Sequence, residues 1–414
     1  MGNEKCKGMQ DLPPDDMQKF RYIEDVFRDC CGKWGYQEVR TPTLEYLHLF
    51  TSTGTLTPSM LGKVYSFLDW DGWSGERVVL RPDGTIPVAR LYIDNLSKQE
   101  TARLFYVTNI FAFEETGRDN RERWQCGAEF LGGLKPMAEA EVIMLAREVM
   151  HKLGFQRVEL CLSHAGLLKS LIRELKLDPG EEAKLISHVL EGDWQPLLEA
   201  KSSNSDFSGI LSVLLGLKGK SSGFLLNVKA LSLKNSLEFN SNLEDFISVA
   251  TLLDSLSLSY EIDLKAIRGF EYYTGICFQL FADGTKIGSG GRYDDLIPLM
   301  GGKTTPACGF ALYVDPILKQ LPLESKERNK LGIIVKAVES TPEITRTCFT
   351  LAQSLRNAGK GAVLDFAGSG GPGYRWNVLV SGKKASPFVL IDCEQGQRRE
   401  LGTIEEIVNY LQSV

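Results

Sequence analysis

Apolar residues near the start of the chain recur at helical spacing, and an extended segment follows them. The recurrence over residues 17–34 predicts an amphipathic helix. We expect Asp15 or Asp16 to cap its first turn and Gly35 to end it, because short acids favour helix N-caps and glycine favours helix ends. Residues 36–42 then form an extended segment that closes on a proline. The apolar positions of the helix are Phe20, Ile23, Phe27, Cys30 and Cys31.

The stretch that follows mixes short alternating runs with helical runs in no regular order. Such a mixture predicts an α+β fold rather than a repeating β–α–β pattern. Pro87 suits the first turn of a helix, where a missing N–H has no cost. Strands are predicted over 64–68, 77–81, 104–113 and 124–131, and helices over 86–96 and 137–153.

The middle of the chain changes character twice. Residues 154–163 are typical of a strand, and residues 165–258 then become helical, which predicts a helical insertion. Within it, Ser202–Ser205 has the composition of an exposed loop. Strands return over 259–291, where Gly288–Gly291 is expected to form a tight turn. The last element predicted before the linker is an apolar segment over 308–318.

The last part of the chain predicts a separate small domain. Residues 321–330 are polar and are typical of a linker. The sequence therefore predicts a core over 1–320 and a small α/β domain over 331–414, long enough to fold by itself. Strands are predicted there over 331–338, 362–366, 377–381 and 387–393, helices over 341–358 and 404–411, and a glycine-rich loop over 368–373.

Composition narrows the class of protein. The 414 residues are 43% hydrophobic and 24% charged, as in soluble globular proteins. No apolar run approaches the ~20 residues needed to cross a bilayer. Residues 1–16 are polar and lack the apolar stretch of a secretory signal, so we expect a cytoplasmic protein without membrane contact. The net charge of −6 and the lack of a long basic block argue against strong nonspecific binding to nucleic acid.

Cysteine and histidine usage predicts neither a metal site nor a cofactor. The nine cysteines contain no CxxC pair, and the four histidines are scattered along the chain. Neither pattern has the ligand spacing of a zinc site. Reduced, mostly buried thiols are the expected state.

Asp83 and Thr85 follow a predicted strand and precede a predicted helix. A carboxylate and a hydroxyl beside a Pro–Gly turn are suited to holding an ammonium group. The same residues also fit an ordinary helix start, with Asp83 as its cap and Thr85 in the first turn. The local pattern alone favours the helix start.

Gln125 and Glu129 share one face of a predicted strand with Gly127, since side chains alternate along a strand. On a pocket wall, the two polar side chains are suited to binding an amine or an imidazole. On a solvent-facing sheet they form an ordinary polar face, and the local pattern alone favours this second interpretation.

Arg268 opens an otherwise apolar and aromatic segment, so a buried arginine there needs a partner. It can neutralise a ligand's carboxylate or phosphate. It can equally form a structural ion pair with Glu271 or Asp263. Tyr272 and Tyr273 are expected to face opposite sides of a strand, one in the core and one lining a pocket.

A glycine-rich stretch over 288–294 looks at first like a phosphate loop. It lacks the Lys-Ser/Thr of a P-loop and the GxGxxG spacing of a dinucleotide site. A strand turn that lets the backbone approach a ligand and a plain glycine-rich hairpin both fit it.

These segments occur together in the order of the histidyl-tRNA synthetase group of class II synthetases, which the chain resembles over about residues 8–320. The resemblance implies an antiparallel sheet flanked by helices in a homodimer. The resemblance is weaker over residues 331–414, which are similar to a degenerate anticodon-binding domain. Residues 35–46 resemble motif 1, 104–132 motif 2, 309–312 the start of motif 3, and 268–275 the histidine-specific segment.

Three departures from the synthetase pattern argue against aminoacylation. Motif 2 of these synthetases carries an arginine that holds the α-phosphate of ATP and the carboxylate of the amino acid, and Ala112 stands in its place. Motif 3 ends in a second ATP-clamping arginine, and Pro316 stands there. A Lys-rich helix of the anticodon-binding domain is replaced by the glycine-rich 368–373, which makes tRNA binding unlikely.

Residues 81–90 resemble a second branch of this group more closely, the regulatory subunits of short-form ATP phosphoribosyltransferase, because synthetases carry Glu at the position of Asp83. This resemblance implies a non-catalytic subunit of histidine biosynthesis that binds the short catalytic subunit. It also implies a homodimer within a larger hetero-oligomer, with histidine as ligand. The histidine pocket carried over by position comprises Asp83, Thr85, Gln125, Glu129, Arg268, Tyr272 and Tyr273.

Within that pocket, the resemblance assigns Asp83 and Thr85 to the α-amino group, and Glu129 and Tyr273 to the imidazole. Two alternatives stay open at the level of sequence. One is a divergent histidine–tRNA ligase, in which Arg118, Arg121 or Arg123 replaces the missing motif 2 arginine. The other is a free histidine-binding sensor with a different partner.

Overall fold

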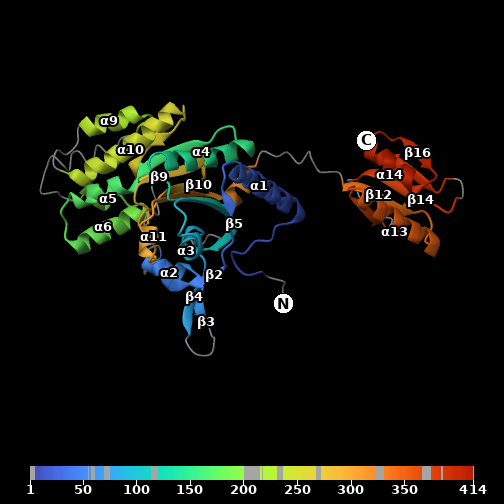
Figure 1. Cartoon of the computed structure of the whole chain (residues 1–414), viewed down its shortest axis with the longest axis horizontal. Helices are drawn as coiled ribbons and strands as arrows, with labels where there is room; N and C mark the ends of the chain where they lie inside the picture. The colour runs from blue at the N-terminus through green and yellow to red at the C-terminus, as the bar shows by residue number, and fades with distance from the viewer. Residues whose placement is uncertain are drawn as a thin grey trace. The chain divides into compact units, whose positions relative to one another are not determined.

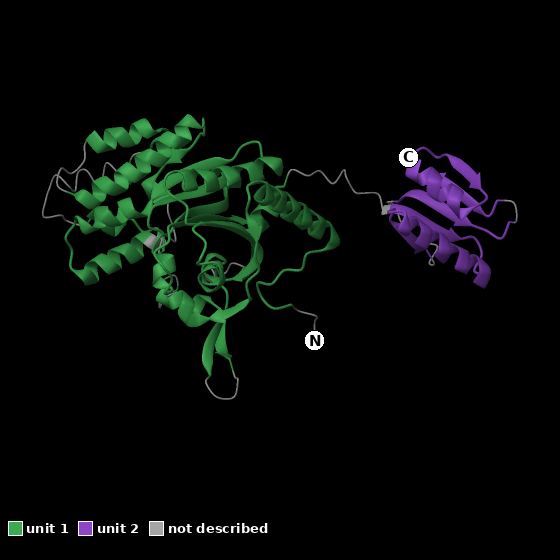
Figure 2. Cartoon of the chain, viewed as in Figure 1, with its two compact units in different colours: residues 1–322 green, residues 323–414 purple. Residues whose placement is uncertain are grey.

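The chain divides into two compact units, residues 1–322 and 323–414 (Figures 1 and 2). The computed structural model describes residues 5–54, 56, 61–69, 75–112, 120–199, 215–216, 218–230, 236–266, 272–321, 331–365, 374–383 and 386–413.

The first unit is built on a large, mostly antiparallel sheet with the strand order β1-β5-β6-β11-β10-β9-β7-β8. Only the outer pairs, β1 with β5 and β7 with β8, run parallel in the described part of this sheet. The order places β6 and β10 on either side of β11, near the centre. The strands are β1 Gln37–Glu38, β5 Ala102–Phe111, β6 Glu122–Leu131, β7 Glu159–His164, β8 Glu261–Ile262, β9 Ile276–Ala282, β10 Thr285–Arg292 and β11 Ala307–Tyr313.

Helices cover both faces of this sheet (Figure 1). On one face lie α1 (Pro14–Lys33), α4 (Met137–Lys152) and α12 (Val314–Gln320), where the ring of Phe27 meets Phe105 and Phe310 edge-on. On the other face, α3 (Thr85–Asn95) and α11 (Leu296–Leu299) pack in a second apolar cluster. The candidate pocket lies on this second face.

The start of α1 differs from the prediction. The helix begins at Pro14 with Pro13 as its N-cap residue, and no side chain caps it. Asp15 and Asp16 lie inside the first turn, because a proline at the first helical position already has the helical φ and starts the helix earlier. Gly35 follows the helix with a φ of 79°, as expected of a C-terminal glycine.

A small sheet of strand order β2-β4-β3 extends from the first unit. Its strands are β2 (Leu44–Tyr46), β3 (Ser66–Asp69) and β4 (Glu76–Leu80). Arg81, which is only 4% exposed, ties it to the large sheet by donating to the carbonyls of Thr41, Pro42 and Asn109. Short helical turns complete this region, α2 over Leu47–Ser52 and η1 over Leu61–Lys63.

The predicted insertion is helical in its described residues, and Ser202–Ser205 falls outside them. The strand predicted over 154–163 begins only at Glu159. The residues before it complete the end of α4 instead, since Gly154 has a φ of 93° and the N–H of Phe155 donates to Met150. The helices are α5 Ala165–Arg173, α6 Pro179–Glu191, α7 Gln195–Glu199, α9 Ser222–Ala230 and α10 Leu237–Ser255, followed by η2 Leu264–Ala266.

Gly288–Gly291 does not form the predicted turn. These residues lie inside β10, paired with β9 on one side and β11 on the other. The turn is made by Asp283 and Gly284, with φ values of 45° and 73°, as a two-residue hairpin requires. The glycines serve close packing instead, because a Cβ at Gly290 would lie 2.3 Å from the carbonyl oxygen of Gly309.

The second unit is a sheet of order β13-β12-β14-β15-β16 with two helices that share its apolar core. Thr341 caps the first helix by accepting from the N–H of Ile344. The predicted glycine-rich loop at 368–373 lies outside the described residues, and β16 was not predicted. The elements are β12 Leu331–Ala337, α13 Pro342–Asn357, β13 Ala362–Asp365, β14 Tyr374–Val380, β15 Phe388–Asp392, β16 Arg398–Leu401 and α14 Ile404–Ser413. Within the described ranges of both units, every helix is too short or too polar to cross a membrane.

Candidate functional site

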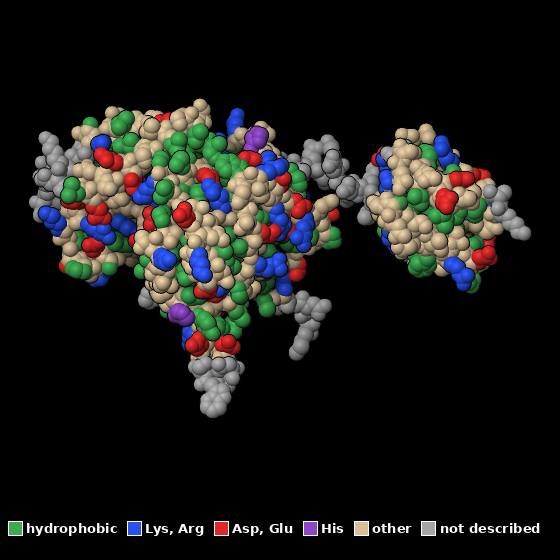
Figure 3. All heavy atoms as spheres, viewed as in Figure 1, with side chains coloured by type: hydrophobic (Ala, Val, Ile, Leu, Met, Phe, Trp, Pro, Cys, Tyr) green, Lys and Arg blue, Asp and Glu red, His purple; other side chains and the backbone are tan. Residues whose placement is uncertain are grey.

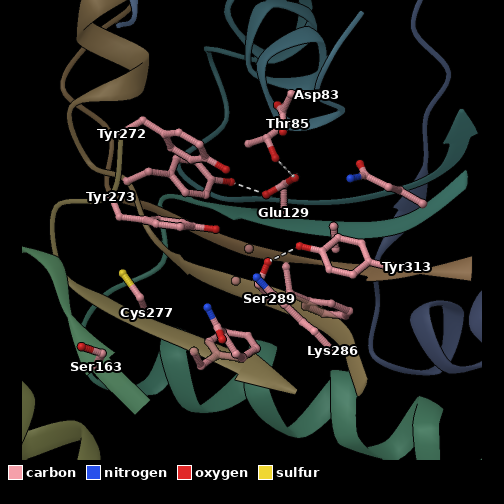
Figure 4. A pocket seen from close by; sticks show the side chains of 18 of the residues that line it. Asp83, Thr85, Glu129, Ser163, Tyr272, Tyr273, Cys277, Lys286, Ser289 and Tyr313 are labelled. Atoms are coloured by element: carbon pink, nitrogen blue, oxygen red, sulfur yellow. Dashed lines mark hydrogen bonds between the residues drawn. The ribbon is translucent and has the colours of Figure 1, made fainter. Parts of the chain in front are cut away.

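A cavity of about 240 Å³ lies over the middle of the large sheet (Figure 4). Its floor comes from β6, β11, β10, β9 and β7, and its walls come from the start of α3 and the segment before β9. Sites for drug-sized ligands usually occupy ~300–1,000 Å³, so this cavity suits a metabolite of amino-acid size.

Glu129 is the buried acid of this cavity, with 1% of its surface exposed. Its Oε1 accepts hydrogen bonds from Thr85 Oγ1 at 2.9 Å and from Tyr106 OH at 3.2 Å. Its Oε2 accepts from Tyr293 OH. Burial raises the pKa of Glu129 to about 8 and the charge of Asp83 adds to this rise, while the three hydrogen bonds oppose it. The cavity therefore holds a carboxyl group whose charge responds to a cationic ligand near neutral pH.

Two glycines make room for this arrangement. Gly309 lies directly opposite Glu129 in the β6–β11 pair, and a Cβ there would lie 1.8 Å from Oε2 of Glu129. Gly127 lies opposite Tyr106 in the β5–β6 pair, and a Cβ there would lie 2.2 Å from the phenol ring. Both positions need glycine because a functional side chain occupies the space of the missing methyl group.

Asp83 and Thr85 fulfil both interpretations made from the sequence. The N-cap residue of α3 is Gly84, and Asp83, one residue earlier, accepts the N–H of Ile86 in the first turn at 3.0 Å through its Oδ1. Both residues also line the cavity, where Thr85 donates to Glu129. Burial raises the pKa of Asp83, and the backbone N–H groups at the start of α3 oppose this rise. The helix start and the pocket wall are thus the same structure.

Tyr272 and Tyr273 contradict the prediction that they face opposite sides of a strand. They precede β9, which begins at Ile276, and both line the cavity. Their ring centroids lie 4.7 Å apart with planes tilted by 38° (Figure 4). Outside a regular strand the backbone need not alternate, and here Thr274 turns to donate its N–H to Arg292. Both tyrosine rings therefore line the cavity, where only one of them was expected to do so.

Gln125 and Glu129 also contradict the interpretation favoured from their local pattern, a solvent-exposed face. Gln125 is 7% exposed and Glu129 only 1%, because α3 covers this face of β6. The Oε1 atom of Gln125 is buried without a hydrogen-bond partner. A buried amide oxygen without a hydrogen bond raises the free energy of the folded chain.

The predicted site residues therefore come together in one cavity, with one exception. Arg268 lies outside the described residues. Sequence reasoning missed Tyr106 and Tyr293, which hold Glu129, although each gives a signal. Tyr106 is a bulky residue opposite a glycine in a strand pair, and Tyr293 directly follows the glycine-rich strand β10. The cavity residues found by both routes are Asp83, Thr85, Gln125, Glu129, Tyr272 and Tyr273.

The positions of the two missing arginines carry no charge in the structure. Ala112 follows β5, and its N–H donates to the carbonyl of Arg121. Pro316 lies in the first turn of α12. Of the arginines considered as replacements, Arg118 lies outside the described residues, and the Arg121 guanidinium donates to the hydroxyl of Tyr65. None of the described residues that line the cavity is an arginine.

Comparison with known proteins assigns the chain to a family. The sequence model of the histidyl-tRNA synthetase family matches residues 8–317. An ATP phosphoribosyltransferase regulatory subunit from Dehalococcoides mccartyi is 46% identical over 408 residues, covering 98% of each chain. The chain belongs to the family of ATP phosphoribosyltransferase regulatory subunits, within the histidyl-tRNA synthetase group.

Relatives with synthetase names are more distant. A histidine–tRNA ligase from Methanocaldococcus jannaschii is 29% identical over 428 residues, covering 98% of this chain and 99% of the ligase. A crystal structure from Bacillus halodurans, titled as an ATP phosphoribosyltransferase regulatory subunit/histidyl-tRNA synthetase, superposes with a TM-score of 0.78. It covers 92% of this chain and 98% of its own, at 24% identity. The predicted fold class, an α+β class II synthetase-like fold, is confirmed.

Proposed function

We propose that this family member is a non-catalytic regulatory subunit of ATP phosphoribosyltransferase in histidine biosynthesis. It activates the short catalytic subunit and contributes to feedback inhibition by histidine. One observation carries the proposal: a pocket built around Glu129 is intact, while Ala112 and Pro316 stand where ATP-binding arginines are expected. The 46% identity to a protein named as such a subunit supports it.

Histidine is the ligand proposed for the cavity. Its ammonium group faces Asp83 and Thr85, and its imidazole faces Glu129 and Tyr273. A buried carboxyl group with two tyrosine hydroxyls around it suits a ring that donates and accepts hydrogen bonds. Gln125 lines the same cavity and completes the set of residues proposed for histidine.

The loss of two positively charged side chains argues against the formation of histidyl-adenylate by this chain. Arginines that stabilise charge developing at phosphorus supply transition-state binding, and removing one preorganised donor costs about 3–4 kcal/mol. Ala112 and Pro316 remove two such groups, so we propose that the chain makes no histidyl-adenylate. The side of the first unit seen in Figure 3 shows basic and acidic side chains interspersed.

Regulation then requires two states of the assembly. Histidine shifts the equilibrium only if it binds one state more tightly than the other, and the ratio of the two affinities sets the strength of inhibition. We place the chain as a homodimer within a larger hetero-oligomer with the catalytic subunit. In this arrangement histidine binds the regulatory chain while catalysis occurs on its partner.

A second candidate is a divergent histidine–tRNA ligase. The end-to-end similarity to the Methanocaldococcus jannaschii ligase favours it. This candidate predicts histidine-dependent exchange between ATP and pyrophosphate by the purified chain, which the regulatory subunit does not perform.

Two measurements on the purified chain test the proposal. Mixing it with a short-form catalytic subunit should give one larger species by light scattering and should raise transferase activity. The chain alone should give no exchange between ATP and pyrophosphate above a blank without histidine. No complex at micromolar concentrations, or robust exchange, would contradict the proposal.

A further inference from the structure

Strand β10 carries an irregularity beside the cavity. Its register with β9 shifts between Lys286, which pairs with Phe281, and Gly288, which pairs with Leu280. In a regular strand, Lys286 and Ser289 would face opposite sides of the sheet. The bulge lets both line the cavity, while Ile287 is fully buried in the hydrophobic core. Bulges beside functional sites re-aim side chains in this way.

The re-aimed side chain is held in place by two neighbours. The Lys286 ammonium lies 5.7 Å from the ring centroid of Tyr313. The hydroxyl of Tyr313 is hydrogen-bonded to Ser289 Oγ, which fixes the ring (Figure 4). Figure 4 shows the Lys286 side chain extending toward this pair inside the cavity. A flexible lysine is thereby kept at one end of the pocket.

Lys286 forms no ion pair with any residue that the structure describes. Of the described residues that line the cavity, it is the only lysine or arginine. The acids of the wall, Asp83 and Glu129, come from the start of α3 and from β6, whereas Lys286 comes from β10. The described part of the cavity wall thus presents acids in one place and the ammonium group of Lys286 in another. This pattern matches a ligand with both charges, such as an α-amino acid.

We propose that Lys286 forms a carboxylate-binding subsite. The ammonium group of Lys286 holds the carboxylate of the amino acid whose own ammonium group faces Asp83 and whose ring faces Glu129. The subsite restores, from a different strand, a positive charge that Ala112 does not provide. The proposal rests on the histidine pocket proposed above and adds the group that distinguishes histidine from analogues lacking a carboxylate.

Calorimetric titration with histidine and with histidinol tests the subsite, because histidinol keeps the amine and the imidazole but carries an alcohol in place of the carboxylate. The unaltered chain should bind histidine more tightly than histidinol. Lys286→Met should weaken histidine binding at least tenfold and leave histidinol binding unchanged. Lys286→Arg should retain most of the histidine affinity. The matched control is Lys303→Met, at an exposed lysine outside the cavity, and it should behave like the unaltered chain.

Each other outcome decides against the subsite in a different way. Equal histidine affinity in Lys286→Met and the unaltered chain overturns the subsite and leaves the histidine pocket standing. Equal weakening of both ligands shows a structural role for Lys286 and also overturns it. Competition by inorganic phosphate that depends on Lys286 would assign the subsite to a phosphoryl group instead. An unaltered chain that does not bind histidine overturns the histidine pocket itself, and the subsite with it.

Discussion

Gly309 and Glu129 face each other across the β6–β11 pair so closely that a Cβ on Gly309 would lie 1.8 Å from the carboxylate oxygen. The buried acid of the pocket therefore depends on the absence of a side chain on the neighbouring strand. Gly309 also begins the segment over 309–312 that resembles motif 3. A glycine at this position preserves the geometry of Glu129.

We expect Gly309→Ala to abolish histidine binding, because the added methyl group forces the Glu129 carboxylate away from Thr85 and Tyr293. Calorimetric titration should show at least a tenfold loss of affinity. Gly32→Ala is the matched control, since nothing lies within 4 Å of a Cβ at that helical position. It should bind histidine normally and should gain about 0.5–1 kcal/mol of stability. Normal histidine affinity in Gly309→Ala would contradict the placement of Glu129 at the ligand.

The raised pKa of Glu129 predicts that histidine binding releases a proton. The empty pocket holds this carboxyl group mostly protonated below its pKa of about 8. The imidazole of histidine is mostly neutral at pH 7, and a neutral ring that donates its N–H to Glu129 favours the ionised carboxylate, so binding releases the proton of Glu129. Histidine affinity should rise between pH 6 and pH 8, by up to about tenfold per pH unit, and level off above.

Titrations in buffers of different ionisation enthalpy measure this proton release directly. Glu129→Gln removes the titrating group but leaves the imidazole of histidine to titrate as before. The difference in pH dependence between the two chains therefore reports on Glu129 alone. Equal proton release by both chains would show that Glu129 keeps its charge state on binding.

His164 predicts a loss of stability in mild acid. It is 1% exposed, and its Nδ1 atom accepts from the N–H of Leu167 at 3.0 Å, which caps α5. Burial lowers the pKa of His164 to about 3, and the charge of Lys135 adds to this. The unfolded chain binds a proton near pH 6.5 and the folded chain does not, so stability is present above that pH. It falls by up to about 1.4 kcal/mol per pH unit as the pH drops from 6.5 toward 3.

His164→Asn should flatten this dependence, because the asparagine oxygen can cap the helix and does not titrate. Urea unfolding of both chains at pH 7, 6 and 5, followed by tryptophan fluorescence, gives the comparison. The same acid slope in both chains would assign the loss of stability to other groups.

Arg292 should be among the most costly side chains to remove. It is fully buried, and it pairs with Glu139 of α4 and with Asp294 while donating to the carbonyl of Gly133. Arg292→Met leaves Glu139 buried without its partner and should cost about 3–5 kcal/mol. A second change, Glu139→Met, should restore much of this loss. Loss of less than 1 kcal/mol in the single variant, measured by urea unfolding, would contradict a buried ion pair.

Local sequence patterns predicted the helices and strands well, but they did not predict which site residues are buried. Strand alternation placed Gln125 and Glu129 on one face, but only the packing of α3 on β6 decides that this face is buried. No local pattern carries that information, because α3 lies far from β6 in sequence. The resemblance to a known family supplied it instead.

Glycine-rich segments were the hardest to interpret. Gly288–Gly291 has the composition of a turn, yet the turn is at Asp283 and Gly284. A glycine needed for close approach and a glycine needed for positive φ look the same in a sequence. The bulge that turns Lys286 into the cavity could not be predicted from the sequence, because it depends on how β10 pairs with β9.

Feedback inhibition of the assembled transferase tests the central claim most directly. Activity of the catalytic subunit is measured against histidine concentration, with either the unaltered chain or Glu129→Gln added at equal amounts. We predict that both chains activate the catalytic subunit, and that the variant shifts half-inhibition to at least tenfold more histidine. Identical inhibition curves would contradict the claim that the pocket around Glu129 is the sensor.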